Sequence, residues 1–542
     1  MASTDKYFVI SIGGTGMRCV EAFTHLCAIG MFGSKEIDIL SIDTDSNNGN
    51  KGRSEQLIER YNRIKGGPNS KTTNDNFFSA KLNIHKFDPN YSGNRESFEL
   101  ISTPNSQNDK DKKENKALAD LFFDNDVQTF DLSHGYRAQT HLGSHLMYHA
   151  IVEAARNVSE GGNRKEDLDL ANFLDKINKA GENARVFIFG SMFGGTGASS
   201  IPIIPKALQE AIKIKDQNAS LHKDAKFGCA LLSDYFEFKV PDSAQKKKKK
   251  VIADSSNFPL NSQAALMFYI NDKTVKETYD LMYHVGWPKK VNYSKKSSEK
   301  DTITGGGEQK NSCHVAELLC ACAVHDFFNR NSGFDEHEIL YRSANQVGNS
   351  FSFEFQDFFG QKYSDEFKNK LGAFFALSNI ILKEEDGAFG SNGVKNLISN
   401  LKKYDAAEYS DIPKSEQDDL NDYMKSFAFN FSNEGDVIPG WLFQIKDSVD
   451  NDFLFNKESF STNPKELKKF SVGELFNDKK HQFATGMFKF KNASDAYENF
   501  RDTIQKEDSV KPNSSQYNTL SEKLLALSFN SFSFLYNVIV KS

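Results

Sequence analysis

The tetrapeptide GGTG occurs twice in this chain, each time between an apolar run and a stretch with helical spacing. The first copy follows Tyr7 to Ile12, and the second follows Arg185 to Phe189 with Gly190 at the start of its turn. Glycine has no Cβ, so the backbone of such a turn can adopt positive φ and approach a ligand closely. A helix that begins after the turn points free N–H groups and the positive end of its dipole at that ligand. Each copy therefore predicts a phosphate cradle.

A glycine turn can also serve only to pack a strand against a helix. This alternative explains one copy readily, but it is hard to apply to both copies at once. Two cradles around one polyphosphate are the interpretation that we favour.

Polar side chains follow the next predicted strand, Ile37 to Ile42. Asp43, Thr44 and Asp45 stand at its carboxyl end, which lies over the ligand crevice in an open parallel α/β sheet. There the two carboxylates could hold ribose hydroxyls, or a metal ion through water. A turn that is simply rich in Asp and Asn is the alternative.

A loop-to-helix junction further along the chain offers a positive charge. Gly135 to Ala138 precede a helix predicted to begin near Thr140, and Arg137 lies at its entry. A guanidinium group binds two phosphate oxygens at once, so Arg137 is a candidate phosphate ligand.

Charge and composition exclude several classes of protein. The 67 Lys and Arg residues are balanced by 73 Asp and Glu, so a net charge of −6 gives no sign of nucleic-acid binding. No apolar run reaches the roughly 18 residues of a membrane span, and the N-terminus lacks the pattern of a secretory signal. Six cysteines without a CxxC pair indicate core thiols. We expect a cytoplasmic protein with no metal-ligand spacing, catalytic triad or Walker lysine motif.

The distribution of polar and apolar residues suggests how the chain is organised. Residues 46–115 and 289–310 are polar and are expected to be insertions, with 108–116 as a solvated loop or a partly disordered insertion. Residues 311–330 are apolar nearly all round, which is typical of a helix buried between domains. We predict an α/β nucleotide-binding domain with a mainly parallel sheet (1–310), joined by the buried helix 311–330 to an α+β C-terminal domain (331–542).

Together these motifs resemble the tubulin/FtsZ superfamily, and its bacterial tubulin-like members in particular. The shared features are the strand–GGTGxR–helix unit, the strand that ends in DTD, and GGTGAS before a helix. In that family a loop close to GGGTGSG wraps the phosphates of GTP. Gly194 to Ser199 match it, with Phe193 where a glycine often lies. The resemblance covers roughly residues 6–340.

The resemblance implies a site for GTP or GDP, with Mg²⁺ as a candidate companion ion. It places Asp234 to Glu237 near the ribose, and two asparagines, Asn261 and Asn311, against guanine, with Gln263 as an alternative to the first. The residues implied to bind the nucleotide are Gly13, Gly14, Thr15, Gly16, Met17, Arg18, Asp43, Asp45, Arg137, Gly194, Gly195, Thr196, Gly197, Ala198, Ser199, Asn261 and Asn311.

Catalysis in this family comes from the next subunit, whose GxxNxD loop reaches the γ-phosphate. The matching segment here is NRNSGFDEHE, residues 329–338, where Asn331, Asp335 and Glu338 are the available polar groups. The spacing of the motif is not reproduced, and Asp335 could instead cap a helix. The resemblance thus implies a head-to-tail homo-oligomer or filament, with GTP hydrolysis completed by the neighbour, and it leaves room for a further protein partner.

Two other functions stay open. A nucleotide-binding scaffold or sensor would share the fold and the ligand but would never hydrolyse GTP. A dinucleotide-binding oxidoreductase would use Gly14, Gly16 and Asp43 as its fingerprint. In that case Cys19 would stand at the third glycine position, and the second GGTG loop would have no role.

Overall fold

The fold is described from a computed structural model of the chain. It describes residues 5–66, 76–89, 109–129, 135–238, 254–292, 311–334, 337–347, 350–352, 412–431, 437–439, 441–444 and 519–536, with single positions at 132, 306, 307, 309, 507, 509 and 517 and in 363–381.

A seven-stranded sheet forms the centre of the molecule, and every neighbouring pair of its strands is parallel. The strand order is β3-β2-β1-β4-β5-β7-β9. The predicted α/β class with a parallel sheet is therefore confirmed. The strands are β1 Lys6–Ile12, β2 Glu36–Ile42, β3 Lys81–Phe87, β4 Ala184–Ser191, β5 Lys226–Leu232, β7 Leu281–Val285 and β9 Glu338–Arg342.

The sheet is buried on both faces, which is why its central strands read as continuous apolar runs. In β1, Tyr7 and Val9 belong to one apolar cluster, whereas Phe8, Ile10 and Ile12 belong to the other. This alternation follows from the period of two in a strand. Helices must therefore cover both sides of the sheet.

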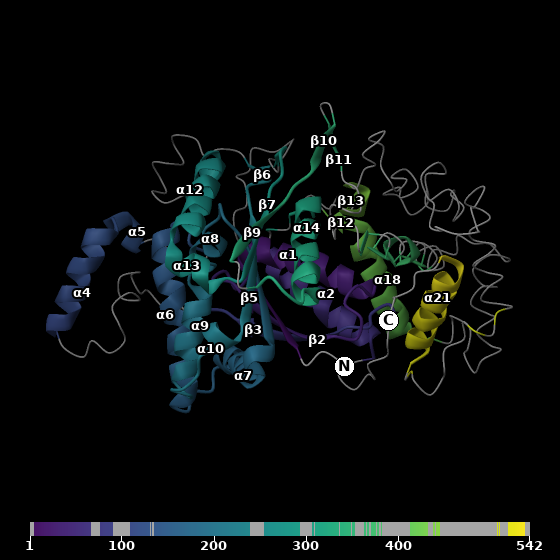
Figure 1. Ribbon diagram of the computed structural model, residues 1–542, viewed down its shortest axis with the longest axis horizontal. Helices are drawn as coiled ribbons and strands as arrows, with labels where there is room; N and C mark the ends of the chain where they lie inside the picture. Colours follow the sequence, from purple (N-terminus) through teal and green to yellow (C-terminus); the bar gives the residue numbers. More distant parts are fainter. Residues whose placement is uncertain are drawn as a thin grey trace.

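One face carries the helices α1, α2 and α14, and the other carries α6, α7 and α9 (Figure 1). α14 packs against α1, β5 and β7 and is buried along its length, as the apolar run predicted. The bounds are α1 Gly13–Ala28, α2 Gly49–Ile64, α14 Val315–Asn329, α6 Thr140–Ser159, α7 Lys165–Ala180 and α9 Ile204–Lys213.

Shorter helices and strands lie between these elements and after them. They are α4 Asp109–Phe122, α5 Asn125–Thr129, α8 Thr196–Ser200, α10 Leu221–Asp224, β6 Phe236–Glu237, α12 Phe258–Asn271, α13 Lys273–Thr278, β8 Val291–Asn292, β10 Asn345–Val347 and β11 Ser350–Ser352. α4 projects away from the rest of the molecule (Figure 1).

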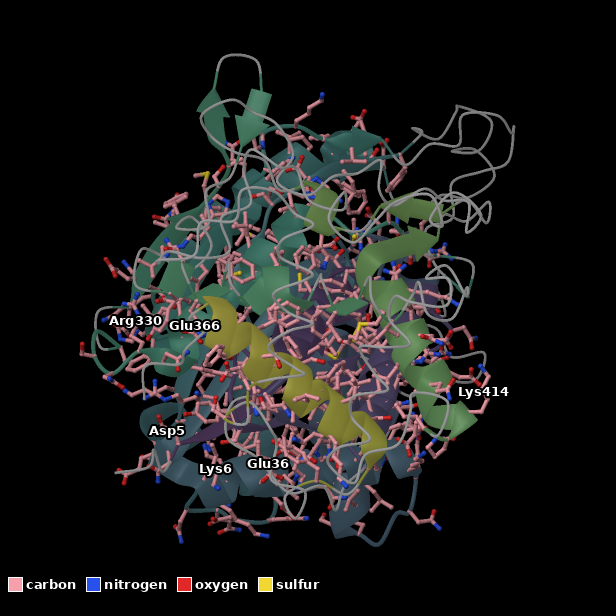
Figure 2. The ribbon with its side chains drawn as sticks, turned by 90° about the vertical axis from the view of Figure 1, so that its right-hand side faces the viewer. Asp5, Lys6, Glu36, Arg330, Glu366 and Lys414 are labelled. Atoms are coloured by element: carbon pink, nitrogen blue, oxygen red, sulfur yellow. The ribbon has the colours of Figure 1, made fainter. Side chains whose placement is uncertain are left out.

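The described C-terminal segments pack onto the α1 face. α18 (Lys414–Ala428) packs against α2, and α21 (Leu520–Tyr536) lies across the same face (Figure 2). Ser521 of α21 donates to Glu416 of α18, and apolar residues of both helices join the cluster of α1 and α14. The paired strands β12 (Phe429–Phe431) and β13 (Val437–Pro439) follow α18.

Several predicted boundaries differ from the structure. The first helix begins at Gly13 instead of after the glycines, and Gly190 lies inside β4. The expected insertion 46–115 contains α2 and the edge strand β3, so it contributes to the sheet domain. The predicted solvated loop 108–116 is wrong over the residues described, because α4 begins at Asp109.

The six cysteines are all buried and free, as expected for core thiols. Among the helices that the structure describes, none has the length and apolar character to cross a membrane.

Candidate functional site

A pocket opens at the carboxyl ends of β1 and β4, the two neighbouring strands in the middle of the sheet. After β1 the chain turns to α1 on one face, and after β4 it turns to α8 and α9 towards the other. Open α/β sheets bind their ligands at such a switch point. About 1020 Å³ of space free of protein atoms lies in the pocket, part of it open to solvent, which is enough for a nucleotide.

The first glycine copy forms one wall of this pocket. α1 follows β1 without an intervening loop, and Gly13 adopts a φ of +68°, which an L side chain rarely takes. No side chain caps the start of α1, so its first free N–H groups remain available to a ligand. A Cβ on Gly13 would lie 3.2 Å from the Cβ of Thr196, so the two glycine loops touch.

The second copy lies beside the first, after the end of β4 and into the first residues of α8. A Cβ on Gly195 would lie 2.8 Å from the backbone nitrogen of Ala138, and one on Gly197 would lie 2.8 Å from that of Ser191. Real Cβ atoms do not approach backbone so closely, so glycine is needed at both positions. Gly194, Gly195, Thr196 and Gly197 all line the pocket.

The loop from Gly135 to Ala138 closes the pocket from the side. Arg137 and Ala138 have φ values of +45° and +64°, in the left-handed region that residues other than glycine seldom occupy. Contact with Gly195 and a 2.8 Å bond from Gln139 N–H to the Tyr136 carbonyl hold this strained shape. Strained backbone gathers at ligand sites, and Arg137 lines the pocket where a phosphate ligand was predicted.

Two carboxylates from the end of β2 line the floor, as predicted. Asp45 accepts the backbone N–H groups of Asn47 and Gly306 at 3.2 and 2.6 Å. Asp43 accepts only from Asp45 N–H, at 3.2 Å, and its Oδ2 is buried without a hydrogen-bond partner among the described residues. Burial raises the pKa of Asp43 to about 7. A buried oxygen with no partner indicates a place for a ligand or a proton.

Aromatic side chains and amides complete the lining of the pocket. Phe193 lies 4.9 Å from Phe258 and 5.4 Å from Phe236 between ring centroids, and all three line the pocket. Such rings can stack on a planar ligand. Four amides also line the pocket, Asn48, Asn50, Gln309 and Asn311. Among them Asn48 packs against the first GGTG copy, where a Cβ on Gly14 would lie 3.1 Å from its Nδ2.

Of the two predicted base-reading asparagines, only Asn311 lines the pocket. Asn261 lies directly behind the wall, where its Nδ2 donates to the Phe193 carbonyl at 3.2 Å and so holds the second glycine loop. Its alternative Gln263 is exposed. In the predicted ribose loop Phe236 lines the pocket, whereas Asp234 is paired with Lys290 at 2.6 Å.

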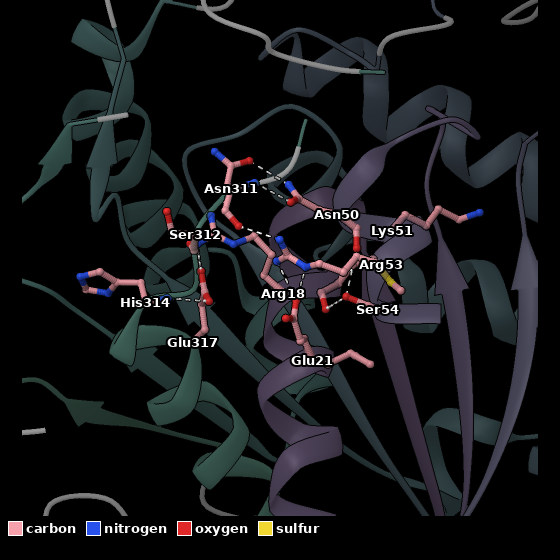
Figure 3. A network of polar contacts seen from close by, with 12 residues as sticks. Arg18, Glu21, Asn50, Lys51, Arg53, Ser54, Asn311, Ser312, His314 and Glu317 are labelled. Carbon is pink, nitrogen blue, oxygen red and sulfur yellow. Dashed lines mark hydrogen bonds and ion pairs between the residues drawn. The ribbon is translucent and has the colours of Figure 1, made fainter. Parts of the chain in front are cut away.

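The predicted phosphate ligand Arg18 lines the wall, but its charge is already engaged by Glu317 (Figure 3). Both side chains are about 2% exposed. Glu317 also accepts from Tyr235 Oη at 2.6 Å and from His314 N–H at 3.0 Å, within the capping box of α14. Burial lowers the pKa of His314 to about 3, which keeps its Nδ1 available to accept the Ala316 N–H. Arg18 therefore ties α1 to the start of α14.

A second arginine strengthens the same connection. Arg53 of α2 pairs with Glu21 of α1 at 2.7 Å and donates to the Asn311 carbonyl at 2.9 Å. Arg18 likewise donates to the Ser312 carbonyl. The peptide that carries Asn311 is thus fixed by two ion-paired arginines (Figure 3).

Four of the residues predicted to bind the nucleotide, Gly16, Met17, Ala198 and Ser199, lie behind the residues that line the pocket. A Cβ on Gly16 would lie 2.8 Å from the Phe189 carbonyl, so this glycine lets α1 sit against β4. Met17 is buried and accepts from Ser11, and Ser199 donates to the Thr196 carbonyl at 3.0 Å. These residues and Ala198 support the loops without lining the pocket.

Two of the predicted catalytic residues, Asn331 and Glu338, lie at the opposite end of the strands and of α14 from the pocket. Asn331 follows the far end of α14, a helix that spans roughly 22 Å at 1.5 Å per residue. Glu338 opens β9, and the pocket lies at the opposite, carboxyl ends of the parallel strands. Neither residue lines the pocket of its own subunit. Asp335 lies outside the described residues.

Within the part of the chain that the structure describes, no group of three His, Cys, Asp or Glu side chains is arranged to hold a metal ion. A scan of protein-family models finds no match to this chain, and a search of curated proteins finds no similar sequence.

Proposed function

We propose that this chain is a tubulin-like GTP-binding protein that assembles head to tail, with hydrolysis completed by the neighbouring subunit. The observation that carries the proposal is the meeting of both GGTG loops, the Gly135–Ala138 loop and the DTD carboxylates at one pocket. Four separate segments of the sequence supply groups suited to a nucleoside polyphosphate.

The phosphates would be held mainly by backbone. The start of α1 is uncapped, and the glycine positions allow the chain to approach the phosphate oxygens closely. Arg137 lines the pocket as a cation for the distal phosphates. Since Arg18 is neutralised by Glu317, backbone N–H groups carry more of this role than the sequence suggested.

The two carboxylates suit a divalent ion that accompanies the phosphates. Mg²⁺ is commonly held by one or two carboxylates together with substrate phosphates and water. The buried, unpartnered oxygen of Asp43 fits that arrangement, with Asp45 beside it. Bound there, the ion would neutralise charge that develops on the phosphates.

The position of the candidate catalytic segment supports assembly. Asn331 and Glu338 lie at the end of the subunit opposite to the pocket, so they cannot serve their own nucleotide. Stacking subunits head to tail would bring this end of one copy over the pocket of the next. Such heterologous contacts extend as filaments when they do not close into rings.

One observation keeps a dinucleotide-binding enzyme as a second candidate. The order β3-β2-β1-β4-β5 is also the order of dinucleotide-binding folds, which bind their ligand at the same switch point. The third glycine position of that fingerprint is occupied here by Cys19, which is fully buried, so this chain departs from the dinucleotide-binding pattern there.

Equilibrium titration with GTP, GDP and NAD, with and without Mg²⁺, separates the candidates. The proposal predicts that both guanine nucleotides saturate the protein one to one and compete for the same site. Retention of NAD without binding of GTP would replace the proposal with the second candidate. If GTP saturates the protein in the titration but a separate assay finds no GTP turnover at any protein concentration, a scaffold or sensor is left.

A further inference from the structure

The four amides that line the pocket are arranged as two pairs, each joining α2 to the segment before α14. Asn48 Nδ2 donates to Gln309 Oε1 at 2.8 Å, and Asn50 Nδ2 donates to Asn311 Oδ1 at 2.9 Å. In each pair the asparagine comes from the start of α2. The partner amide comes from the opposite segment and also lines the pocket.

Backbone donors determine which end of each α2 asparagine faces its partner. Asn50 Oδ1 accepts the backbone N–H of Asn311 at 2.9 Å. Asn48 Oδ1 caps α2 by accepting the N–H groups of Asn50 and Lys51 at 2.9 and 3.2 Å. Because a backbone N–H can only donate, both Oδ1 atoms are committed. Both Nδ2 groups must therefore point at the partner amides.

The same hydrogen bonds fix which way the two partner amides are turned. The side-chain oxygens of Gln309 and Asn311 are used as acceptors, which leaves their NH₂ groups for a ligand. Neither NH₂ group donates to any residue that the structure describes. Figure 3 shows the nitrogen of Asn311 turned away from Asn50. Arg53 holds the carbonyl of the same residue, so the presentation is rigid.

We propose that Asn50 selects the base by fixing the Asn311 amide as a donor, an inference that rests on the pocket's binding a nucleotide. Guanine offers two neighbouring acceptors, O6 and N7, whereas adenine offers an acceptor at N7 and a donor at N6. The NH₂ group of Asn311 matches the acceptor at guanine O6 and opposes the donor at adenine N6. Asn50 is thus a positioning residue that acts on the base through Asn311.

Titration of the full-length protein with GTP, inosine triphosphate and ATP tests this inference. Inosine triphosphate keeps O6 and N7 but lacks the 2-amino group, so it should bind like GTP. Both should bind about tenfold or more tightly than ATP. Equal affinity for ATP, or inosine triphosphate binding as weakly as ATP, would overturn the inference while the phosphate cradle stands. If none of the three binds, the proposed function itself is removed.

Asn50→Asp tests the mechanism. The new carboxylate can still accept the Asn311 N–H, but it cannot donate, so the Asn311 amide should turn over and present its oxygen to the base. The preference for GTP over ATP should then fall by about tenfold. The matched control is Asn62→Asp on the same helix, where Nδ2 donates to the Leu82 carbonyl at 2.8 Å. This control should keep the wild-type ratio.

Asn311→Asp gives a second, independent variant in case Asn50→Asp does not fold. Its carboxylate would accept from Asn50 Nδ2 and present only oxygen to the base, so the same loss of preference is expected. An unchanged GTP-to-ATP ratio in a folded variant of either kind would contradict the assignment of Asn50.

Discussion

At the scale of single residues, Asp43 is the most unusual group in the pocket. Its carboxylate is buried, one oxygen lacks a partner among the described residues, and burial raises its pKa from 3.8 to about 7. Near neutral pH it therefore exchanges between a neutral and a charged form. A bound polyphosphate would favour the neutral form, because two negative charges at one site repel each other.

Nucleotide affinity measured without Mg²⁺ should accordingly fall as the pH rises through 7. The folded protein binds more protons than the unfolded chain between about pH 4 and 7, so the stability of the nucleotide-free protein should also fall across that window. Asn at this position stays neutral, so Asp43→Asn should flatten both profiles. Titrations and melting curves from pH 5.5 to 8.5 check this, and a variant that keeps the full pH dependence would contradict it.

Gly195 gives a steric test of the cradle. Gly195→Ala places a Cβ 2.8 Å from the Ala138 nitrogen, which should displace the Gly135–Ala138 loop and weaken GTP binding at least about tenfold. The control Gly52→Ala adds a methyl group where no atom lies within 4 Å, so it should bind normally. Circular dichroism and thermal melting should show both variants folded. Normal GTP binding by folded Gly195→Ala would contradict the cradle.

At the scale of the elements, the network around the start of α14 couples the pocket to the long central helix. Arg18 and Glu317 are both buried, and removal of one partner leaves the other charge uncompensated. This typically costs about 3–5 kcal/mol.

Glu317→Gln should therefore lower the melting temperature by several degrees. The double variant Arg18→Met with Glu317→Gln should lose less than the sum of the two single variants, because no buried charge is left alone. Thermal melting of all four proteins measures the coupling. Additive losses would mean that the pair does not connect α1 to α14 energetically.

The same elements show what the sequence could predict. The strands β1, β2 and β4 were foreseeable because burial on both faces leaves visible apolar runs, whereas the edge strand β3 was missed. The GGTG copies marked where β1 and β4 give way to helices. α2 was missed because polar groups fill much of its buried side. Lys51 is 3% exposed and pairs with Asp88 at 2.7 Å and with Glu55 at 3.3 Å, a pattern with no apolar period.

Because α2 was not predicted, the residues of the site at its start were missed as well. Asn48 and Asn50 stand at the start of α2, and in the sequence they resemble a polar turn after the DTD motif. The phenylalanines of the pocket were concealed differently, since a chain with 47 of them gives no reason to single out Phe236 or Phe258. α4 was missed because its exposed surface depends on helix-forming Lys and Glu instead of burial.

At the scale of the whole molecule, the proposed function assigns different roles to the two ends of the subunit. The candidate nucleotide pocket lies at the carboxyl ends of the strands, whereas Asn331 and Glu338 lie towards the other end of α14. A single subunit would then bind GTP but hydrolyse it poorly.

Two variants with different defects should regain GTP turnover when they are mixed. Gly195→Ala lacks a working pocket, and Asp335→Asn lacks the proposed catalytic carboxylate but should bind GTP normally. Each alone should turn over GTP slowly. In a mixture, intact pockets would meet intact catalytic ends, so turnover should rise above the sum of the separate samples. A strictly additive mixture would argue against a site shared between subunits.

The most direct test of the central claim is GTP turnover measured against protein concentration, with light scattering read on the same samples. If a neighbour completes the site, turnover per subunit should be low in dilute protein and should rise above a critical concentration together with scattering. Turnover per subunit that stays constant over the whole range, whether or not scattering increases, would contradict a nucleotide site completed by a neighbour.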